Sequence, residues 1–397
     1  MSPIEEYWNT LQNEYHNQPL SDEDIVKLDE LILNEDIENI RNGVMLMSTL
    51  APAAFCRYLT LYNDSMVLND SHAWPARLLV ERALVEAIKA EQMWQPLYTT
   101  GVFESMEFRA LGNVDFENLT DHEKDFCVRL GKEMVHIPAG NFMMGALEDD
   151  EDAYDDEKPR HKVTLTRDFL MGKYAVTQAL WQSVMGSNPS HRKGANRPVE
   201  CVSWFDCVAF CNKLSEQEGL TPAYDGLGDY QVGDDQNMGE DEIESLSAGI
   251  TCNWNAKGYR LPTEAEWEYS ARGGEYHKYS GSDNVDEVAW CDDNSGGQTH
   301  PVGQKKPNNF GLYDMSGNVW EWCWDRMEYD EEYEIGGDSV YRHGPVTDPY
   351  GSAVGSRRVY RGGDWYGRPM FVLSSFRNDD DPAHRYGIIG FRIECSL

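Results

Sequence analysis

The chain has 397 residues, of which 34 are Lys or Arg and 69 are Asp or Glu, so its formal net charge is −35. A surface this acidic repels phosphate backbones and anionic lipids, so we expect neither nucleic acid nor a membrane as a partner. No apolar run approaches the roughly 18 residues of a membrane-spanning helix. The first residues carry no export or lipidation signal, and we therefore expect a cytoplasmic protein.

The nine cysteines agree with that location. Their number is odd, and no two are spaced as Cys-x-x-Cys. Disulfide frameworks in secreted proteins and zinc ribbons both use paired, regularly spaced cysteines. We therefore expect reduced thiols. Cys207 and Cys211, four residues apart on one predicted helix, are expected to be core residues rather than metal ligands.

Residues 1–125 are predicted to form a helical domain. Apolar residues recur at helical spacing from Ile25 to Ile32, and again within 37–50 and 77–95. Helices joined by short turns are typical of an all-α bundle or a helical-repeat array, and both alternatives remain open. This part of the chain carries no catalytic motif, and its acidic runs are interpreted as a solvated face.

Residues 126–397 have a different amino-acid composition. Gly, Pro, Trp and Tyr become frequent, and short apolar segments lie between turn residues. Thr177 and Ser203 are placed to cap two helices, and Thr263 begins a Thr-x-x-Glu capping box. The remainder is predicted to be short strands and long loops. Two acidic stretches are predicted to be solvent loops: residues 148–157 and 233–244.

Six sequence blocks, which follow one another along the chain, resemble those of a known protein family. They read VHIPAGNFMMG (135–145), YAVTQALW (174–181), RPVECVSW (197–204), YRLPTEAEWEYSARGG (259–274), NFGLYDMSGNVWEW (309–322) and VYRGGDW…GFRIE (359–394). Together they resemble the formylglycine-generating enzyme, or sulfatase-modifying factor, family. The resemblance implies a C-type-lectin-like fold with few helices, a small twisted sheet and much loop. We therefore predict an α+β domain over residues 126–397, preceded by the all-α domain.

The resemblance also bears on catalysis. Oxidases of this family convert a substrate cysteine to formylglycine and hold copper(I) with two cysteines, about five apart, that follow an R-G-G-[SD]-[WF] block. Here that block is Arg361–Trp365, and no cysteine stands between it and Cys395. Copper(I) prefers thiolate sulfur, and one methionine, Met370, does not replace two thiolates. We therefore expect no copper and name no catalytic residue.

A calcium loop is implied by the same resemblance. The ligands would be the side chains of Asp314 and Glu321 and the carbonyls of Gly317 and Val319, a mixture that suits a hard cation. In the alternative, Asp314 and Glu321 accept backbone N–H bonds and no ion binds. A second family calcium site aligns around Asn294, where the family often has an acid.

The C-terminal blocks also resemble the variable proteins of diversity-generating retroelements, whose diversified stretch is framed by R-G-G-x-W and G-F-R. Adenine-directed diversification of Asn codons does not produce Lys, Glu or Gln, and residues 335–393 contain none of the three. The side chains between the two frames mix rigid aromatic with small polar groups, as adaptable binding surfaces do. The candidate ligand-binding residues are Asp364, Tyr366, Arg368, Phe371, Phe376, Asn378, Asp380, His384 and Tyr386.

Three functional hypotheses follow. The first is a non-catalytic module that binds a protein or another macromolecule through residues 364–388, on a surface that is diversified between copies of the gene. The alternative is a cytosolic regulatory or structural partner that acts through the helical domain. An oxidase of the formylglycine-generating class is third, because its cysteine pair is missing. The ligand and the oligomeric state stay open.

Overall fold

The computed structural model describes residue 108 and residues 111–147, 153–327, 344–352 and 354–397. Its contacts divide the chain into two compact units, Met1–Asn113 and Val114–Leu397. The predicted helices before residue 108 lie outside the described residues. The predicted domain boundary at residue 125 falls within helix α8 (Asp121–Gly131), which begins with a capping box between Thr120 and Glu123.

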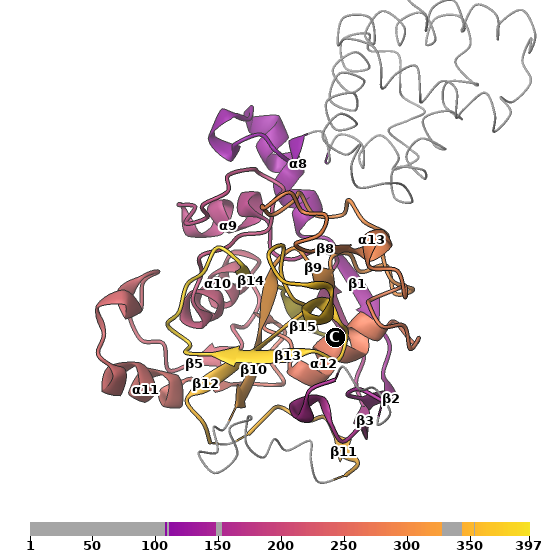
Figure 1. Cartoon of the computed structure of the whole chain (residues 1–397). Coiled ribbons are helices and arrows are strands. Elements are labelled where there is room, and N and C mark those ends of the chain that lie inside the picture. The colour runs from indigo at the N-terminus through magenta and orange to yellow at the C-terminus, as the bar shows by residue number, and fades with distance from the viewer. Residues whose placement is uncertain (1–107, 109–110, 148–152, 328–343, 353) are drawn as a thin grey trace, which may run out of the picture. The chain divides into compact units, whose positions relative to one another are not determined.

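The second unit combines small sheets with short helices, which confirms the predicted α+β class (Figure 1). One sheet has the order β1-β4-β15-β7, all antiparallel, and brings the beginning and the end of the unit together. Its strands are β1 (Met134–Ile137), β4 (Phe169–Gly172), β15 (Glu394–Ser396) and β7 (Tyr259–Arg260).

A second four-stranded sheet lies at the centre and has the order β13-β12-β10-β14, with β10 and β14 parallel. Its strands are β13 (Arg377–Asp380), β12 (Arg357–Arg361), β10 (Trp320–Met327) and β14 (Ile389–Phe391). The remaining described strands are β2 (Gly140–Met144), β3 (His161–Leu165) and β11 (Val346–Thr347) in one sheet, β5 (Tyr224–Asp225) with β6 (Thr251–Cys252), and β8 (Ala289–Trp290) with β9 (Ser316–Gly317).

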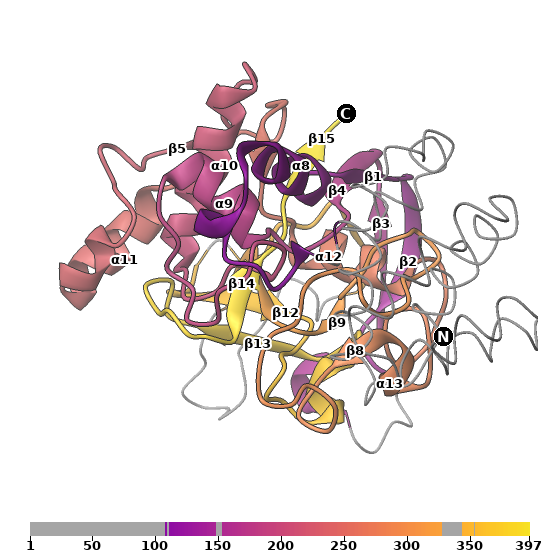
Figure 2. The same ribbon diagram turned by 90° about the horizontal axis from the view of Figure 1, so that it is seen from above.

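Strand β10 is buried on both faces because its side chains alternate between two cores. Trp320, Trp322 and Trp324 belong to the core that contains α9 (Gln178–Met185) and α10 (Trp204–Gln217). On the opposite face, Glu321 accepts a hydrogen bond from Trp267 of α12 (Glu264–Arg272), and Asp325 accepts one from the backbone of Glu264. Figure 2 shows α9 and α10 on one side of β14 and α12 on the other.

The predicted helix caps are confirmed. Thr177, Ser203 and Thr263 each accept a hydrogen bond from the backbone N–H three residues further on, and α9 ends at Gly186 in the left-handed conformation. Cys207 and Cys211 are fully buried in the α10 core, as expected. The other described helices are α11 (Glu240–Gly249), α13 (Val285–Val288) and the 3-10 turns η2 (Phe116–Asn118), η3 (Asp155–Glu157), η4 (Asp234–Asn237) and η6 (Pro369–Val372).

The prediction that both acidic stretches are solvent loops holds only in part. Most of their described residues are exposed or half-buried, but both stretches contain helical turns and each has one buried carboxylate. The second stretch contains η4 and the first turn of α11, whose three acidic residues lie near the positive end of the helix dipole. Asp235 is buried because Arg385 donates to its carboxylate at 2.8 Å. In the first stretch, Glu157 is buried and its carboxylate accepts from the Tyr154 N–H.

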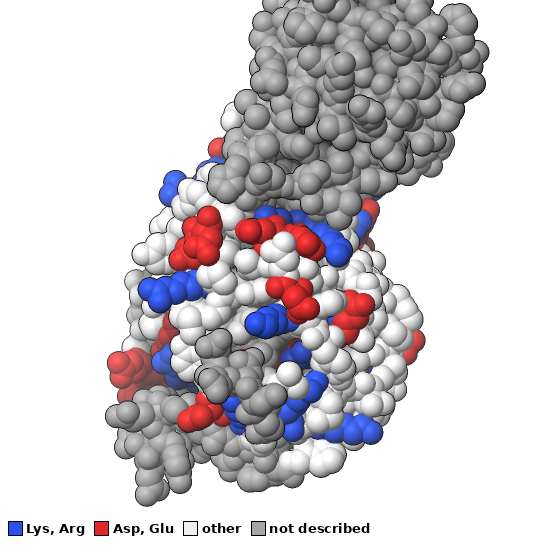
Figure 3. Space-filling model, turned by 45° about the vertical axis from the view of Figure 1, so that its right-hand side comes forward, with Lys and Arg blue, Asp and Glu red and all other residues white. Residues whose placement is uncertain are grey.

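The described surface mixes charges of both signs. On the face shown in Figure 3, acidic and basic side chains are interspersed among uncharged ones, so the acidic excess of the chain forms no single patch on that face. None of the helices in the described ranges is long and apolar enough to cross a membrane.

Candidate ligand-binding surface

Six of the nine candidate binding residues meet around one groove of about 500 Å³. They come from the loop after β12, from η6 and from the start of β13. Three residues that the sequence analysis did not select, Asp292, Trp320 and Gly367, complete the lining. The six candidates in the groove are Asp364, Tyr366, Arg368, Phe371, Phe376 and Asn378.

The loop at residues 362–367 is fixed from within by two features. Gly363 has a φ of +74°, and a Cβ there would lie 2.5 Å from the carbonyl oxygen of Phe371, so the turn requires glycine. The carboxylate of Asp364 accepts from the N–H groups of Tyr366 and Gly367 at 2.7 and 3.1 Å. Asp364 is buried, and it therefore shapes the loop as well as lining the groove.

Distant segments also hold this loop. The Asn318 carbonyl accepts from the Trp365 N–H at 3.0 Å, and Ser295 Oγ donates to the Trp365 carbonyl at 2.7 Å. The N–H of Asp292 donates to the Gly367 carbonyl at 3.0 Å. Trp365 is half-buried, and its indole N–H donates to the Gly387 carbonyl. The loop backbone is thus set by bonds that do not involve the exposed side chains of Tyr366 and Arg368.

Aromatic rings form the apolar part of the groove. Phe376 lies 5.2 Å from Phe371 and 5.8 Å from Trp320, measured between ring centroids. Phe376 is only 8% exposed, whereas Tyr366 is 72% exposed and stands beside Trp365. The groove therefore has a packed aromatic floor and an exposed tyrosine at its rim.

The charged groups at the groove are of both signs. Arg368 and Asp292 are exposed, and neither forms an ion pair with another described residue. Burial raises the pKa of Asp364, an effect that the bonds from the Tyr366 N–H and the Trp320 side chain partly offset. An exposed cation and an exposed carboxylate beside aromatic rings can bind polar and apolar groups of one partner together.

The other three candidate residues form a second cluster at the end of β13 and in the segment that follows it. Asp380 Oδ1 lies 2.7 Å from His384 Nδ1, and the Tyr386 hydroxyl lies 3.3 Å from that same nitrogen. Asp380 is two residues after Asn378 on β13, so both side chains point to the same face of the strand. Strand β13 thus connects the groove to the Asp380 cluster.

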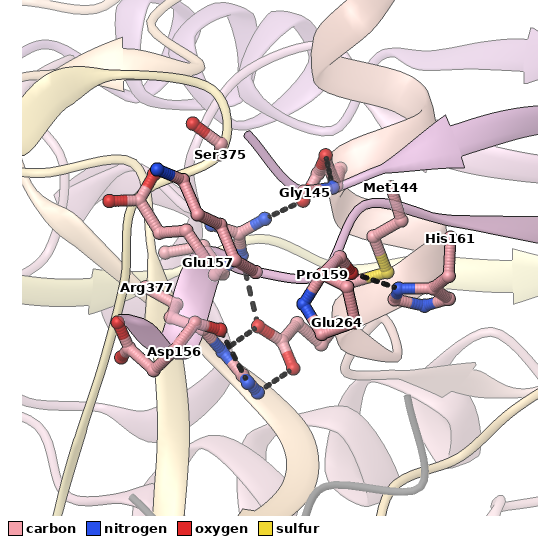
Figure 4. Close-up of a pocket in the computed structure, with 12 residues that line it drawn as sticks. Met144, Gly145, Asp156, Glu157, Pro159, His161, Glu264, Ser375 and Arg377 are labelled. Atoms are coloured by element: carbon pink, nitrogen blue, oxygen red, sulfur yellow. Dashed lines mark hydrogen bonds and ion pairs between the residues drawn. The ribbon is translucent and has the colours of Figure 1, made fainter. Parts of the chain in front are cut away.

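The opposite face of β13 is anchored in a buried ion-pair network, which Figure 4 shows around a small pocket of about 20 Å³. Arg377 Nε donates to Glu264 Oε1 at 2.8 Å, and the neighbouring strand contributes Arg361, which pairs with Glu264 and Glu268. Arg361 and both glutamates are fully buried. Arg392 and Glu321 form another buried ion pair.

One of the four candidate calcium ligands, Glu321, is already paired with a cationic side chain of the protein. Both carboxylate oxygens of Glu321 accept hydrogen bonds from the Arg392 guanidinium, at 2.8 and 3.0 Å, and one also accepts from Trp267. The positive charge of Arg392 thus stands where an ion beside Glu321 would have to bind. Asp314 Oδ2 accepts from the Gly303 N–H at 2.8 Å, whereas its Oδ1 has no hydrogen-bond partner among the described residues. Gly317 pairs with Trp290 between β9 and β8, and Val319 packs in the core.

The second calcium position is likewise engaged by the protein. Asn294 Oδ1 accepts from the Cys291 N–H at 3.0 Å, and its amide donates to Asp286 and to the Ala289 carbonyl. These bonds stabilise a turn. Calcium binding at either position stays a prediction from the sequence.

The copper cysteines of the resembled oxidases have no counterpart at the groove. The residues that follow Arg361–Trp365 form the wall of the groove and the 3-10 turn η6. Cys395 lies on β15, where its thiol contacts the Lys257 carbonyl. The nearest earlier cysteine, Cys323, is fully buried on β10.

The described unit is thus a loop-rich α+β domain that presents a groove with an aromatic floor. Residues 121–396 match the family model described as sulfatase-modifying factor enzyme 1-like domain. The chain therefore belongs to the sulfatase-modifying factor family, and its resemblance to that family is confirmed.

Three similar proteins illustrate the range of this family. The chaperone protein LppX of Paenibacillus barcinonensis is 44% identical over 210 residues, which cover 48% of this chain and 72% of that protein. The formylglycine-generating enzyme of Streptomyces coelicolor is 28% identical, over 66% and 89% of the two chains. The solved structure of Treponema denticola variable protein 1 matches with a TM-score of 0.56 and 37% identity, over 66% of this chain and 95% of that one. The expected fold is thereby confirmed for the described unit.

Proposed function

We propose that residues 114–397 form a non-catalytic binding module that holds a protein ligand on the surface from Asp364 to Tyr386. The observation that carries the proposal is the groove, where Tyr366 and Arg368 extend from a hydrogen-bonded loop beside a packed aromatic floor. Tyrosine and arginine on a preorganised backbone are the side chains most often dominant in protein interfaces.

The separation of scaffold and surface supports a binding role. The loop is held by Gly363, by the Asp364 carboxylate and by bonds to Asn318 and Ser295. The exposed side chains make none of these bonds, so they can be replaced without loss of the loop. The likeness to variable protein 1 of Treponema denticola supports the same interpretation, and we propose that this surface is diversified between copies of the gene.

The class of ligand is inferred from a relative. The Paenibacillus barcinonensis relative is named a chaperone protein, and a chaperone acts on proteins. We infer that the ligand here is also a protein. The groove offers exposed charges of both signs and aromatic rings, which together suit a mixed polar and apolar protein surface.

Copper oxidase chemistry is not proposed. The resembled mechanism needs two thiolates on one metal, and the sequence has no cysteine from Asp364 to Glu394. If a copper(I) titration of the reduced chain in a competing chelator found one tightly bound ion held by two thiolates, the enzyme hypothesis would regain support.

The binding proposal is tested with the purified full chain as bait in an extract of the source cells. Retained proteins are quantified for the native chain, for Tyr366→Ala with Arg368→Ala, and for Tyr350→Ala as a control. Tyr350 is 59% exposed, packs on Trp254 and does not line the groove.

We expect at least one protein to be retained by the native chain and by the control but lost with the groove variant. That protein, once purified, must bind the native chain directly. A set of retained proteins that is identical for all three baits would contradict the proposal and point to another part of the chain, including residues 1–125.

A further inference from the structure

A group of metal-ligating side chains lies outside the groove, in the connection between α9 and α10. One ligand atom each from His191, Glu200 and Cys201 lies within 4.8 Å of the other two. His191 is exposed and Glu200 is fully buried, so the group reaches from the surface into the protein. No other group of three such residues this close occurs in the described ranges.

The Glu200 carboxylate is the decisive feature. Its Oε1 accepts from the Arg192 N–H at 2.8 Å, but its Oε2 has no hydrogen-bond partner among the described residues. None of the described Lys or Arg side chains forms a salt bridge with Glu200. A buried carboxylate oxygen without a partner costs free energy comparable to a lost charged hydrogen bond, so a cation there would stabilise the fold.

The geometry directs this oxygen toward the histidine. A Cβ added to Gly387 would lie 3.5 Å from Glu200 Oε2 and 3.6 Å from His191 Nδ1, so both atoms border the same small space. The backbone around them is fixed. Ser190 Oγ accepts from the Glu200 N–H at 3.1 Å, and the Tyr386 carbonyl accepts from the Cys201 N–H at 3.0 Å.

Cys201 completes the set. Its φ of +62° is unusual for a residue other than glycine and sets the direction of its side chain. A metal ion displaces the thiol proton on coordination, so Cys201 would bind a cation as the thiolate.

We propose that His191, Glu200 and Cys201 form a zinc site with one open position. One imidazole nitrogen, one carboxylate oxygen and one thiolate sulfur are a donor set that zinc accepts in tetrahedral geometry, and the sulfur disfavours calcium and magnesium. Three protein ligands leave the fourth position for water or for a donor from a partner. The exposed His191 places that position near the surface.

A metal ion bound at this site would stabilise the neighbouring binding surface. Gly387, which borders the site, accepts from the Trp365 indole, and Tyr386 is bonded to Cys201. The zinc proposal does not depend on the proposed binding function, because it rests on the buried carboxylate and its two neighbours alone.

The test titrates the reduced, chelator-stripped full chain with zinc and, separately, with cobalt(II). We expect one zinc ion per chain and a cobalt spectrum with tetrahedral and thiolate charge-transfer bands. Cys201→Ser should remove the charge-transfer band. Glu200→Gln and His191→Asn should each weaken zinc binding at least about tenfold. Cys395→Ser, which changes another half-buried thiol, should leave the spectrum and the affinity unchanged.

A second measurement distinguishes a loss of zinc binding from a folding defect. Zinc should raise the melting temperature of the native chain and of Cys395→Ser, but not that of Cys201→Ser. The proposal is overturned if zinc does not bind saturably to the native chain, or if Cys201→Ser keeps the affinity and the cobalt band.

Discussion

Arg377 on β13 forms a two-point ion pair with Glu264 at the first turn of α12, with nitrogen–oxygen distances of 2.8 and 2.5 Å. Both side chains are buried. The pair joins residues that lie 113 positions apart in the sequence. Because Arg377 faces α12, the next residue, Asn378, faces the groove, so the ion pair orients the edge strand that carries part of the binding surface.

The first prediction concerns this anchor. Glu264→Gln would leave the buried guanidinium groups of Arg361 and Arg377 without their shared charge. Removing one partner of a buried ion pair costs about 3–5 kcal/mol, and we expect a loss of that size in the free energy of unfolding, measured in urea. Glu275→Gln is the matched control, because the Glu275 side chain is 40% exposed and pairs only with His277 among the described residues. Equal stability of the two variants would contradict the anchoring role.

The second prediction separates surface from scaffold within the groove. Tyr366 is largely exposed, so Tyr366→Ala should change the free energy of unfolding by no more than about 0.5 kcal/mol. Phe376 packs between Phe371 and Trp320, so Phe376→Ala should cost about 3–5 kcal/mol. Urea unfolding of both variants tests this. A large loss with Tyr366→Ala would mean that the rim tyrosine is part of the fold.

The third prediction concerns pH. Burial lowers the pKa of His300, which stacks on Trp290, to about 4. An unfolded histidine titrates near pH 6.5, so the unfolded state binds more protons between these values. The contribution of His300 to the free energy of unfolding is therefore fully present above about pH 6.5. It decreases by about 3 kcal/mol as the pH falls toward 4.

Asp314 changes the free energy of unfolding in the same pH range, but in the opposite direction. Burial raises its pKa to about 6, so its contribution is present at low pH and is lost as the pH rises through that value. The measurement is therefore the difference in unfolding free energy between the native chain and His300→Gln as a function of pH. We expect this difference to shrink as the pH falls from about 6.5 to 4.5, whereas a difference independent of pH would contradict the assignment.

The fourth prediction addresses diversification. The 3′ end of the gene is sequenced deeply in a population grown from one cell, together with its flanking DNA. We expect substitutions clustered in codons 364–388 and a near-identical template copy nearby. A uniform sequence without a template would contradict diversification and leave a binding module of fixed specificity.

Local features of the fold were predictable because they depend on neighbours in the sequence. The caps at Thr177, Ser203 and Thr263 follow from side chains that bond three residues away. The nine candidate binding residues lie in one segment between two recognisable blocks. Their separation into a groove and an Asp380 cluster follows from the path of β13, which no local pattern specifies.

Long-range contacts explain what the sequence did not predict. Asp292, two residues after β8, and Trp320, at the start of β10, lie about 45 to 70 residues before the loop that they contact. The buried position of Asp235 depends on Arg385, 150 residues later. Glu200 and Cys201 are adjacent, but their relation to His191 depends on a loop held by Ser190 and Tyr386. Such pairings arise only when distant segments pack together.

The most direct test of the binding account is site-specific photocrosslinking in the source cells. A photoreactive phenylalanine analogue replaces Tyr366 in one chain and Tyr350 in another, since both tyrosines are well exposed. The account predicts that position 366 crosslinks to a discrete partner protein and that position 350 does not. The same crosslinked products from both positions, or none from position 366, would contradict a protein-binding surface at the groove.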